Sequence, residues 1–246
     1  MTRRERQREA TYEEIVTTAR TLLAAGEELS LRAVATRMGL TAPALYRYVG
    51  SYQELVDLVA FEIDKAATEE FRAAASTQPD DDPVAQLVCA AVAFRRWALR
   101  DRAEFTLAFA NPTADTTCVR RELLTAATSG HYMNGLLLQV WELTRFPHPR
   151  LEELDPVVVT TLRDPLMPID ASRVPDEDRG LLWVFQQAWA SLYGTVTLEV
   201  FGHLDPRIIE SGRLFEEMVR SWLPRLAIED PEGRYVELLR AEIARR

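Results

Sequence analysis

Residues 41–48, TAPALYRY, gather small, aromatic and cationic side chains within about two helical turns. Hydroxyl and guanidinium groups are donors that suit phosphate oxygens, and Arg47 can also pair with both acceptors on a guanine edge. A helix over this stretch that buries Leu45 and Val49 leaves the other side chains facing outward. The outward-facing candidates for DNA contact are Thr41, Ala42, Pro43, Ala44, Tyr46, Arg47 and Tyr48. The pattern predicts a short helix that enters the major groove of DNA.

A preceding helix must position this one. Residues 31–38 place Leu31, Val34, Ala35 and Met38 on one helical face, and Ser30 is placed to cap the free N–H groups. Gly39 ends that helix, Thr41 can cap the next, and Pro43 falls in its first turn, where a missing N–H costs nothing. The spacing therefore predicts two short helices joined by a tight turn.

Charge is unevenly distributed along the chain. The formal net charge is −9, yet residues 1–50 carry eight Arg against six Glu. Four of these arginines lie within the first eight residues, and we expect them to form a flexible arm that reaches phosphates or a minor groove. Candidates for DNA contact outside the second helix are Arg3, Arg4, Ser30 and Arg32. A solvated, frayed terminus is the alternative interpretation of this segment.

Length and composition restrict the class of protein. A chain of 246 residues exceeds the commonest domain size, and no apolar run is long enough for a membrane span. The charged N-terminus does not resemble a secretory signal, so we expect a cytoplasmic location. Cys89 and Cys118 have no cysteine partner nearby in sequence and are expected to be small buried thiols. No metal and no cofactor is expected.

The periodicity predicts an all-α fold, because apolar spacings of three and four recur while alternating runs are scarce. Ser51 and Glu54 resemble a capping box that opens a helix running to about residue 75. Residues 76–83 contain two Pro and three Asp, and they form the clearest break near a domain boundary. Other helices are expected at about 9–25, 84–100, 101–110, 115–146, 156–163, 177–203, 206–226 and from 231.

The first 60 residues resemble the TetR/AcrR family of bacterial transcriptional regulators. The resemblance rests on residues 37–49, RMGLTAPALYRYV, followed by 51–55, SYQEL. It implies a DNA-binding domain over residues 1–60 and a helical ligand-binding and dimerisation domain over 61–246. It also implies a palindromic DNA operator, a homodimer and repression that a small-molecule effector relieves.

Three positions depart from the family pattern. Tyr48 replaces the usual His, and Val49 replaces the usual Phe with a smaller apolar side chain. Tyr52 stands where the family often has a Lys that contacts phosphate. The Tyr52 hydroxyl or Arg47 is expected to take over that contact, so Tyr52 joins the DNA-binding candidates.

A second motif lies at residues 189–194, WASLYG. It resembles the tryptophan-histidine-glycine signature of one class of TetR C-terminal domains, with Tyr193 in the histidine position. The resemblance implies ligand binding and dimerisation in this region. Helices 177–203 and 206–226 are apolar on more than one side, which predicts burial by the core and by a partner subunit, or by an intramolecular core alone.

Aromatic residues concentrate in the second half, accompanied by a few polar groups. Such a mixture suits a small apolar or aromatic ligand, although each member could instead belong to the core. The candidate ligand-binding residues are Trp97, Phe105, Phe109, His131, Asn134, Trp141, Phe185, Gln186, Trp189 and Tyr193.

Two other functions compete with DNA binding. Catalysis is disfavoured, because the three histidines share no metal-ligand spacing and no Gly-rich phosphate loop or G-x-S-x-G elbow occurs. The N-terminal helices could instead bind a protein partner. Salt distinguishes these cases, since DNA binding weakens steeply with ionic strength and hydrophobic helix docking does not.

Overall fold

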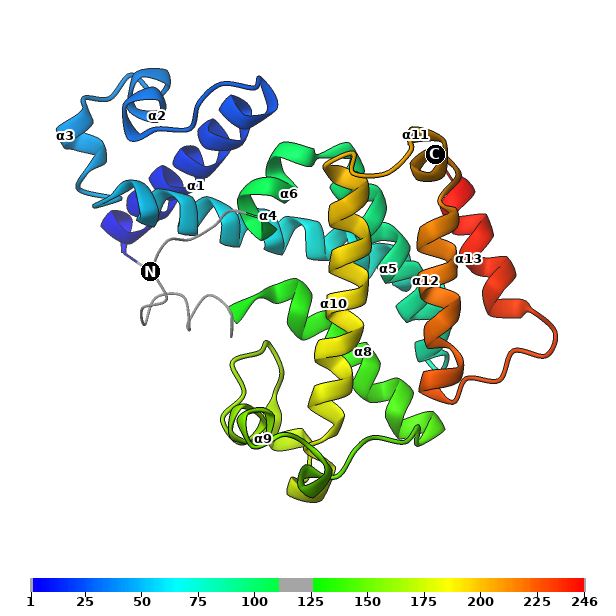
Figure 1. Cartoon of the computed structure of the whole chain (residues 1–246). Coiled ribbons are helices and arrows are strands. Elements are labelled where there is room, and N and C mark those ends of the chain that lie inside the picture. The colour runs from blue at the N-terminus through cyan, green and yellow to red at the C-terminus, as the bar shows by residue number, and fades with distance from the viewer. Residues whose placement is uncertain (1, 111–125, 246) are drawn as a thin grey trace. The chain divides into compact units, whose positions relative to one another are not determined.

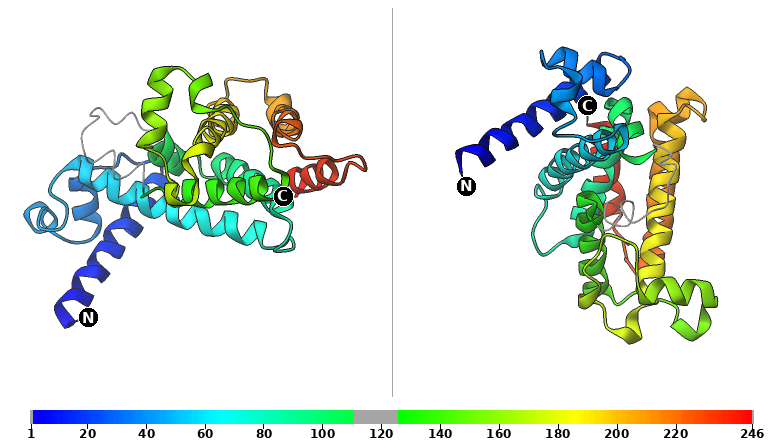
Figure 2. Two further views of the ribbon diagram at one scale, coloured as in Figure 1. Left: turned by 90° about the horizontal axis from the view of Figure 1, so that it is seen from below. Right: turned by 90° about the vertical axis from the view of Figure 1, so that its left-hand side faces the viewer.

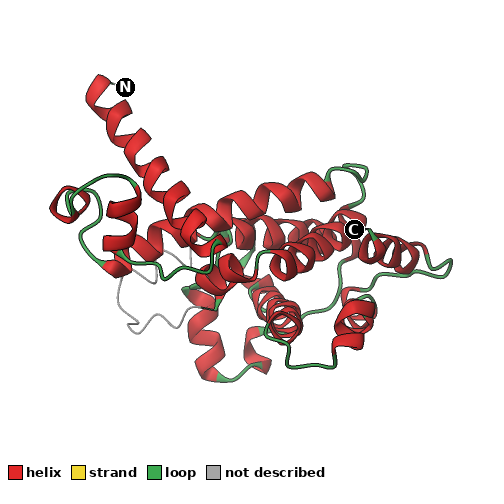
Figure 3. Ribbon diagram, turned by 90° about the horizontal axis from the view of Figure 1, so that it is seen from above, coloured by secondary structure: helices red, strands yellow, loops and turns green. Residues whose placement is uncertain are grey.

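The computed structural model describes residues 2–110 and 126–245, and these residues form helices joined by loops (Figure 3). No strand occurs within these two ranges. The prediction of an all-α fold is confirmed.

The described residues form two compact units. The first contains residues 2–66 and 101–110, and the second contains 67–100 and 126–245. Helix α4, Tyr52–Ala75, belongs to both units, so the division falls inside a helix rather than at residue 60 or in the loop of residues 76–82. Proline and aspartate residues in that loop mark the end of α4 and the start of α5, Pro83–Arg100.

The first unit combines the N-terminal helices with a helix from later in the chain. Ile15, Leu22, Val34, Leu45 and Leu55 are among its buried side chains. Its helices are α1 Arg3–Ala24, α2 Leu31–Arg37, α3 Ala42–Leu45, the first part of α4, and α6 Arg102–Phe109 (Figure 1).

The predicted flexible arm is helical. α1 begins at Arg3, because Thr2 and Glu5 form a capping box: the Thr2 N–H donates to Glu5 Oε2 at 2.7 Å, and the Glu5 N–H donates to Thr2 Oγ1 at 3.3 Å. The predicted start near residue 9 is therefore wrong by about two turns. Arg3 and Arg4 lie exposed on the first turn of α1, which projects beyond the other helices of this unit (Figure 2).

The second unit is a bundle around α5 and α10. Helix α10 packs against α5, α9 and α12, and α13 packs against α5 and α12 (Figure 1). Its α-helices after α5 are α8 Thr128–Thr144, α9 Pro156–Arg163, α10 Leu181–Val200, α11 Pro206–Ser211, α12 Arg213–Trp222 and α13 Arg234–Ala244. Short 3₁₀ turns occur at Leu151–Glu153, Ala171–Arg173, Asp176–Asp178 and Pro224–Leu226.

The helix predicted over 206–226 is broken. Gly212 adopts a left-handed conformation with φ of +64° between α11 and α12. A Cβ atom at this position would lie 2.6 Å from Ile243 Cγ2, so the corner requires glycine for both its φ and its close packing. The sequence pattern missed this break because the apolar spacing continues across it.

Two expectations involve residues 111–125. The helix predicted over 115–146 appears as α8 in its later part, and Cys118 lies outside the described residues. Cys89 is buried, and burial raises its pKa to about 11.

Candidate functional site

Helices α2 and α3 form a compact two-helix unit. The Ser30 hydroxyl accepts a 3.1 Å hydrogen bond from the Ala33 N–H, which confirms its predicted role as the cap of α2. Gly39 has a φ of +68°, and the Leu40 N–H donates to the Ala35 carbonyl at 2.9 Å. The positive φ at Gly39 turns the chain directly from one helix toward the next.

Helix α3 is only four residues long and ends where the aromatic residues begin. Pro43 lies in its first turn, and Leu45 and Val49 are fully buried, as the pattern predicts. Thr41 occupies the N-cap position, but its side chain makes no capping hydrogen bond. Residues 46–48 continue in a turn rather than in the predicted helix, since the Tyr48 N–H donates to the Leu45 carbonyl at 2.8 Å.

Most of the predicted DNA-binding side chains lie on the surface of the first unit. Tyr46 and Tyr52 are each 51% exposed. Ser30, Ala42, Ala44 and Tyr48 are partly buried. The exposed candidates besides these tyrosines are Arg3, Arg4, Arg32, Thr41, Pro43 and Arg47.

Tyr48 has a packing role that the sequence pattern did not indicate. Its ring meets that of Tyr12 edge to face at 5.8 Å, and the Tyr12 hydroxyl donates to the Tyr48 carbonyl at 3.1 Å. Arg8 donates to the Tyr12 hydroxyl at 3.1 Å and stacks over the Tyr12 ring. Tyr12 thus joins α1 to the turn after α3, and Arg8 contacts Tyr12 from the same helix. The four-residue spacing of Arg8 and Tyr12 was a possible signal of their pairing.

The start of α4 is capped reciprocally. The Glu54 N–H donates to the Ser51 hydroxyl at 3.1 Å, and the Glu54 carboxylate accepts from the Gly50 N–H at 2.7 Å. The expected capping box therefore forms, except that Glu54 reaches the amide one residue before the cap. These contacts fix the chain immediately before Tyr52.

Helix α6 packs on α1 in the first unit. Arg20 Nε lies 2.7 Å from Glu104 Oε1, and Arg20 Nη2 lies 3.0 Å from Glu104 Oε2. Phe105 is fully buried and stacks on Phe109 at 5.7 Å. Phe105 and Phe109 therefore lie in the unit of the two-helix motif, whereas the other predicted ligand-binding residues lie in the second unit.

Three predicted ligand-binding residues come together in the second unit. Trp189 and Tyr193 of α10 stack with ring centroids 5.4 Å apart, and Trp189 lies 5.7 Å from Phe94. Trp97 lies 6.3 Å from Phe94. We call Phe94, Trp97, Trp189 and Tyr193 the aromatic cluster. Trp189 is 37% exposed, so the cluster reaches the surface of its unit.

Trp141, Phe185, Asn134 and Gln186 make packing or polar contacts inside the second unit, and His131 is exposed. Trp141 and Phe185 belong to the buried core of the second unit. Asn134 donates to the Pro168 carbonyl at 3.0 Å, and Gln186 lies 3.9 Å from the Met167 sulfur. His131 is exposed on α8.

The second unit also contains a surface hollow of about 440 Å³. Leu151, Arg163, Asp176 and Arg179 line it. No predicted ligand-binding residue is among them.

None of the described helices is long and apolar enough to cross a membrane.

Helices α2 and α3 are a capped pair of short helices. Small and hydroxyl-bearing residues and an arginine lie on the second helix and its following turn. This arrangement defines a helix-turn-helix transcriptional regulator. A family model described as "Tetracyclin repressor-like, C-terminal domain" matches residues 87–222, more than half of the chain. The chain belongs to the tetracycline-repressor-like family.

Relatives of known class agree with this assignment. The chain is 26% identical over 208 residues to the HTH-type transcriptional regulators Rv1816 of Mycobacterium tuberculosis and Mb1846 of Mycobacterium bovis. The match covers 81% of this chain and 84% of each relative.

Two solved structures share the fold. The protein described as "putative regulatory protein SCO4313" superposes with a TM-score of 0.60 at 25% identity, covering 91% of this chain and all of that one. RolR, solved in complex with resorcinol, gives a TM-score of 0.59 at 14% identity, covering 98% of this chain and 96% of RolR.

Proposed function

We propose that this regulator is a dimeric repressor that binds a palindromic operator and is released by a small apolar or aromatic ligand. The observation that carries the proposal is the exposed surface of α3 and its following turn. There Tyr46 and Arg47 are exposed, and they follow the small residues Pro43 and Ala44 in the chain. Small side chains permit close approach to base edges, while the longer ones supply donors.

The proposed contacts separate by chemistry. The phosphate contacts set the orientation of the domain. The residues proposed to make them are Ser30, Arg32, Thr41 and Tyr46. Ala42, Pro43 and Ala44 touch thymine methyl groups, and Arg47 binds guanine or phosphate. Tyr52 supplies a neutral phosphate contact in place of a lysine. In this proposal, Tyr48 acts through its packing on Tyr12.

A single helix-turn-helix unit covers only half a palindrome, so the proposal includes a homodimer. Helices α10, α11 and α12 are the proposed interface, and Gly194 of α10 has an open environment in the single chain. Because small residues allow helices to approach closely, this part of α10 suits a partner helix. The exposed apolar side chains in the proposed interface are Leu198, Phe201, Ile208 and Leu214.

The aromatic cluster is the proposed ligand site. Trp189 and Tyr193 offer stacked, partly exposed rings, which suit an aromatic molecule. The binding of resorcinol by RolR supports this ligand class through the shared fold. Phe71 of α4 packs edge to face on Trp97 at 5.9 Å, so α4 contributes to the surroundings of the cluster.

Release requires a ligand that prefers one arrangement of the dimer, because equal affinity for both arrangements shifts nothing. In the proposed mechanism, a ligand at the aromatic cluster displaces α4 through Phe71. The same helix begins at Tyr52, next to the helix-turn-helix. Its displacement changes the separation of the two DNA-reading units and weakens both half-site contacts together.

A gel shift with the DNA upstream of the chain's own gene tests operator binding. We expect retardation at low salt, and footprinting should show two protected half-sites about one helical turn apart. No retardation at micromolar protein would reject DNA binding. Retention of a protein partner in high salt instead would favour the interaction-module alternative.

A thermal-shift screen of small aromatic compounds tests the ligand site. Compounds that stabilise the wild type should lose their effect on Trp189→Phe and keep it on Trp183→Phe, a matched change on the same helix. Equal stabilisation of both variants would remove Trp189 from the ligand site.

A further inference from the structure

Arg95 and Glu199 form an ion pair inside the second unit. Arg95 Nε lies 2.6 Å from Glu199 Oε2, and the side chains are 9% and 0% exposed. Burial raises the pKa of Glu199, and the hydrogen bond from Arg95 opposes that change. A buried pair of this kind adds little net stability compared with a well-packed apolar pair, so stability alone does not account for it.

The same guanidinium connects more than two helices. Arg95 Nη2 donates to the Ile209 carbonyl of α11 at 2.7 Å, and the guanidinium lies over the Phe215 ring of α12 at 5.5 Å. A Cβ atom at Gly212 would lie 3.6 Å from Arg95 Nη1. One side chain from α5 thus contacts the end of α10, the last turn of α11 and the start of α12.

The residues that Arg95 holds are sequence neighbours of exposed apolar residues. Glu199 is buried and follows Leu198, which is exposed; the carbonyl held by Arg95 belongs to Ile209, which follows the exposed Ile208. Arg95 therefore contacts the residue that follows Leu198 through the ion pair, and the residue that follows Ile208 through the backbone hydrogen bond. The positions of the Leu198 and Ile208 side chains can therefore depend on Arg95 without direct contact with it.

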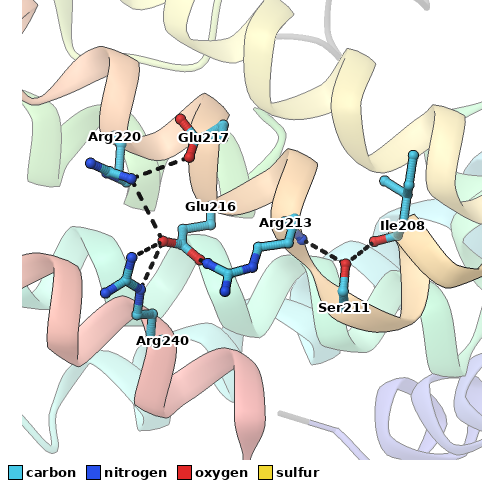
Figure 4. Close-up of polar contacts among 7 residues, drawn as sticks. All are labelled: Ile208, Ser211, Arg213, Glu216, Glu217, Arg220 and Arg240. Atoms are coloured by element: carbon cyan, nitrogen blue, oxygen red, sulfur yellow. Dashed lines mark hydrogen bonds and ion pairs between the residues drawn. The ribbon is translucent and has the colours of Figure 1, made fainter.

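The corner and α12 are fixed from other directions as well. The Ser211 hydroxyl donates to the Ile208 carbonyl at 2.9 Å and accepts from the Arg213 N–H at 3.3 Å. Glu216 lies 2.8 Å from both Arg213 and Arg240, so α12 is bound to α13 (Figure 4). Arg95 links the end of α10 to this corner through Glu199 and the Ile209 carbonyl.

We propose that the Arg95–Glu199 pair positions the end of α10 against α11, and so determines the shape of the apolar surface on which a second copy of this chain docks. This inference rests on the proposed homodimer. Arg95 and Glu199 are positioning residues, because they act through Leu198, Ile208 and the backbone between them.

The test measures dimer dissociation by sedimentation, with circular dichroism and thermal unfolding recorded in parallel. The double variant Arg95→Met/Glu199→Met removes both charges at similar volume and should fold cooperatively. We expect its dimer to dissociate at least tenfold more readily than the wild type. Arg95→Lys keeps the charge but lacks the fork that reaches both Glu199 and Ile209, and it should fall in between.

Glu199→Gln keeps the side-chain size and one acceptor, and it decides the test if the double variant does not fold. Glu153→Gln is the matched control, because Glu153 forms an exposed ion pair with Arg150. It should dimerise like the wild type. If the double variant folds and dimerises like the wild type, the inference is wrong. If only Glu199→Gln folds, a dimer like that of the wild type in this variant overturns it instead. A wild type that remains monomeric would instead overturn the proposed homodimer itself, and this inference with it.

Discussion

Arg20 of α1 and Glu104 of α6 form a bidentate ion pair, with N–O distances of 2.7 and 3.0 Å. The pair connects α6, which begins at residue 102, to α1 in the first unit. Its partners are 39% and 14% exposed, so solvent screens it only in part.

Breaking this pair should loosen α6. We expect Glu104→Gln to lower the free energy of unfolding by about 1 kcal/mol, after allowance for partial exposure. Urea unfolding monitors the loss. Glu70→Gln, at an exposed pair with Arg100, should change stability by less, and equal losses in both variants would contradict a special role for Glu104.

The Tyr12 hydroxyl should matter for stability, while the Tyr46 hydroxyl should matter for DNA. Tyr12→Phe removes the hydrogen bond to the Tyr48 carbonyl and should cost about 1 kcal/mol of unfolding free energy. Tyr46→Phe alters an exposed side chain, so it should leave thermal unfolding unchanged and weaken DNA binding. The reverse pattern in the two assays would contradict these assignments.

Local signals explain which parts of this region could be predicted from sequence. Ser30, Gly39, Pro43 and the apolar spacing of α2 are cues within a few residues. They predicted the two-helix motif, but the second helix ends at Leu45 instead of continuing through residue 48. The capping box at Thr2 and Glu5 was an equally local cue for the start of α1, but the basic composition suggested an arm instead.

Tertiary contacts explain what could not be predicted. Phe105 and Phe109 have the same apolar character as Trp97, and nothing nearby in sequence indicates that α6 packs on α1. The aromatic residues of the second half likewise divide between core and partly exposed cluster according to packing. Phe94, which joins Trp97 to Trp189, gave no signal that distinguished it from other apolar residues of α5.

Glu216 should make stability depend on acid pH. The hydrogen bond from Arg240, aided by the charges of Arg240 and Arg213, lowers the pKa of Glu216 below its ordinary value of 4.5. A lowered pKa in the folded state contributes stability above pH 4.5, and this contribution is lost as the pH falls through the folded value. Glu216→Gln should therefore be less stable than the wild type at pH 7, with a smaller difference near pH 3.

Urea unfolding at several pH values measures this effect. Glu217→Gln is the control, because Glu217 is its exposed neighbour and pairs with Arg220 at 3.2 Å (Figure 4). A difference for Glu216→Gln that stays constant from pH 7 to pH 3 would contradict the assignment.

Gly194 provides a direct test of the proposed interface. A Cβ atom there meets nothing within 4 Å in the single chain, and the same is true of Gly135 in α8. Gly194→Met should weaken the dimer at least tenfold, about 1.4 kcal/mol, while Gly135→Met leaves it intact. Both variants should fold. If Gly194→Met sediments as a dimer in the same way as the wild type, this part of α10 does not belong to the interface.

We propose that α3 and its following turn read the DNA sequence. The most direct test is fluorescence anisotropy of the upstream DNA with wild type and Arg47→Ala across a salt series. We expect wild-type affinity to fall steeply with salt and Arg47→Ala to bind about 1–3 kcal/mol more weakly at constant salt with its dimer intact. Salt-independent binding, or equal affinity of the two proteins, would contradict the account.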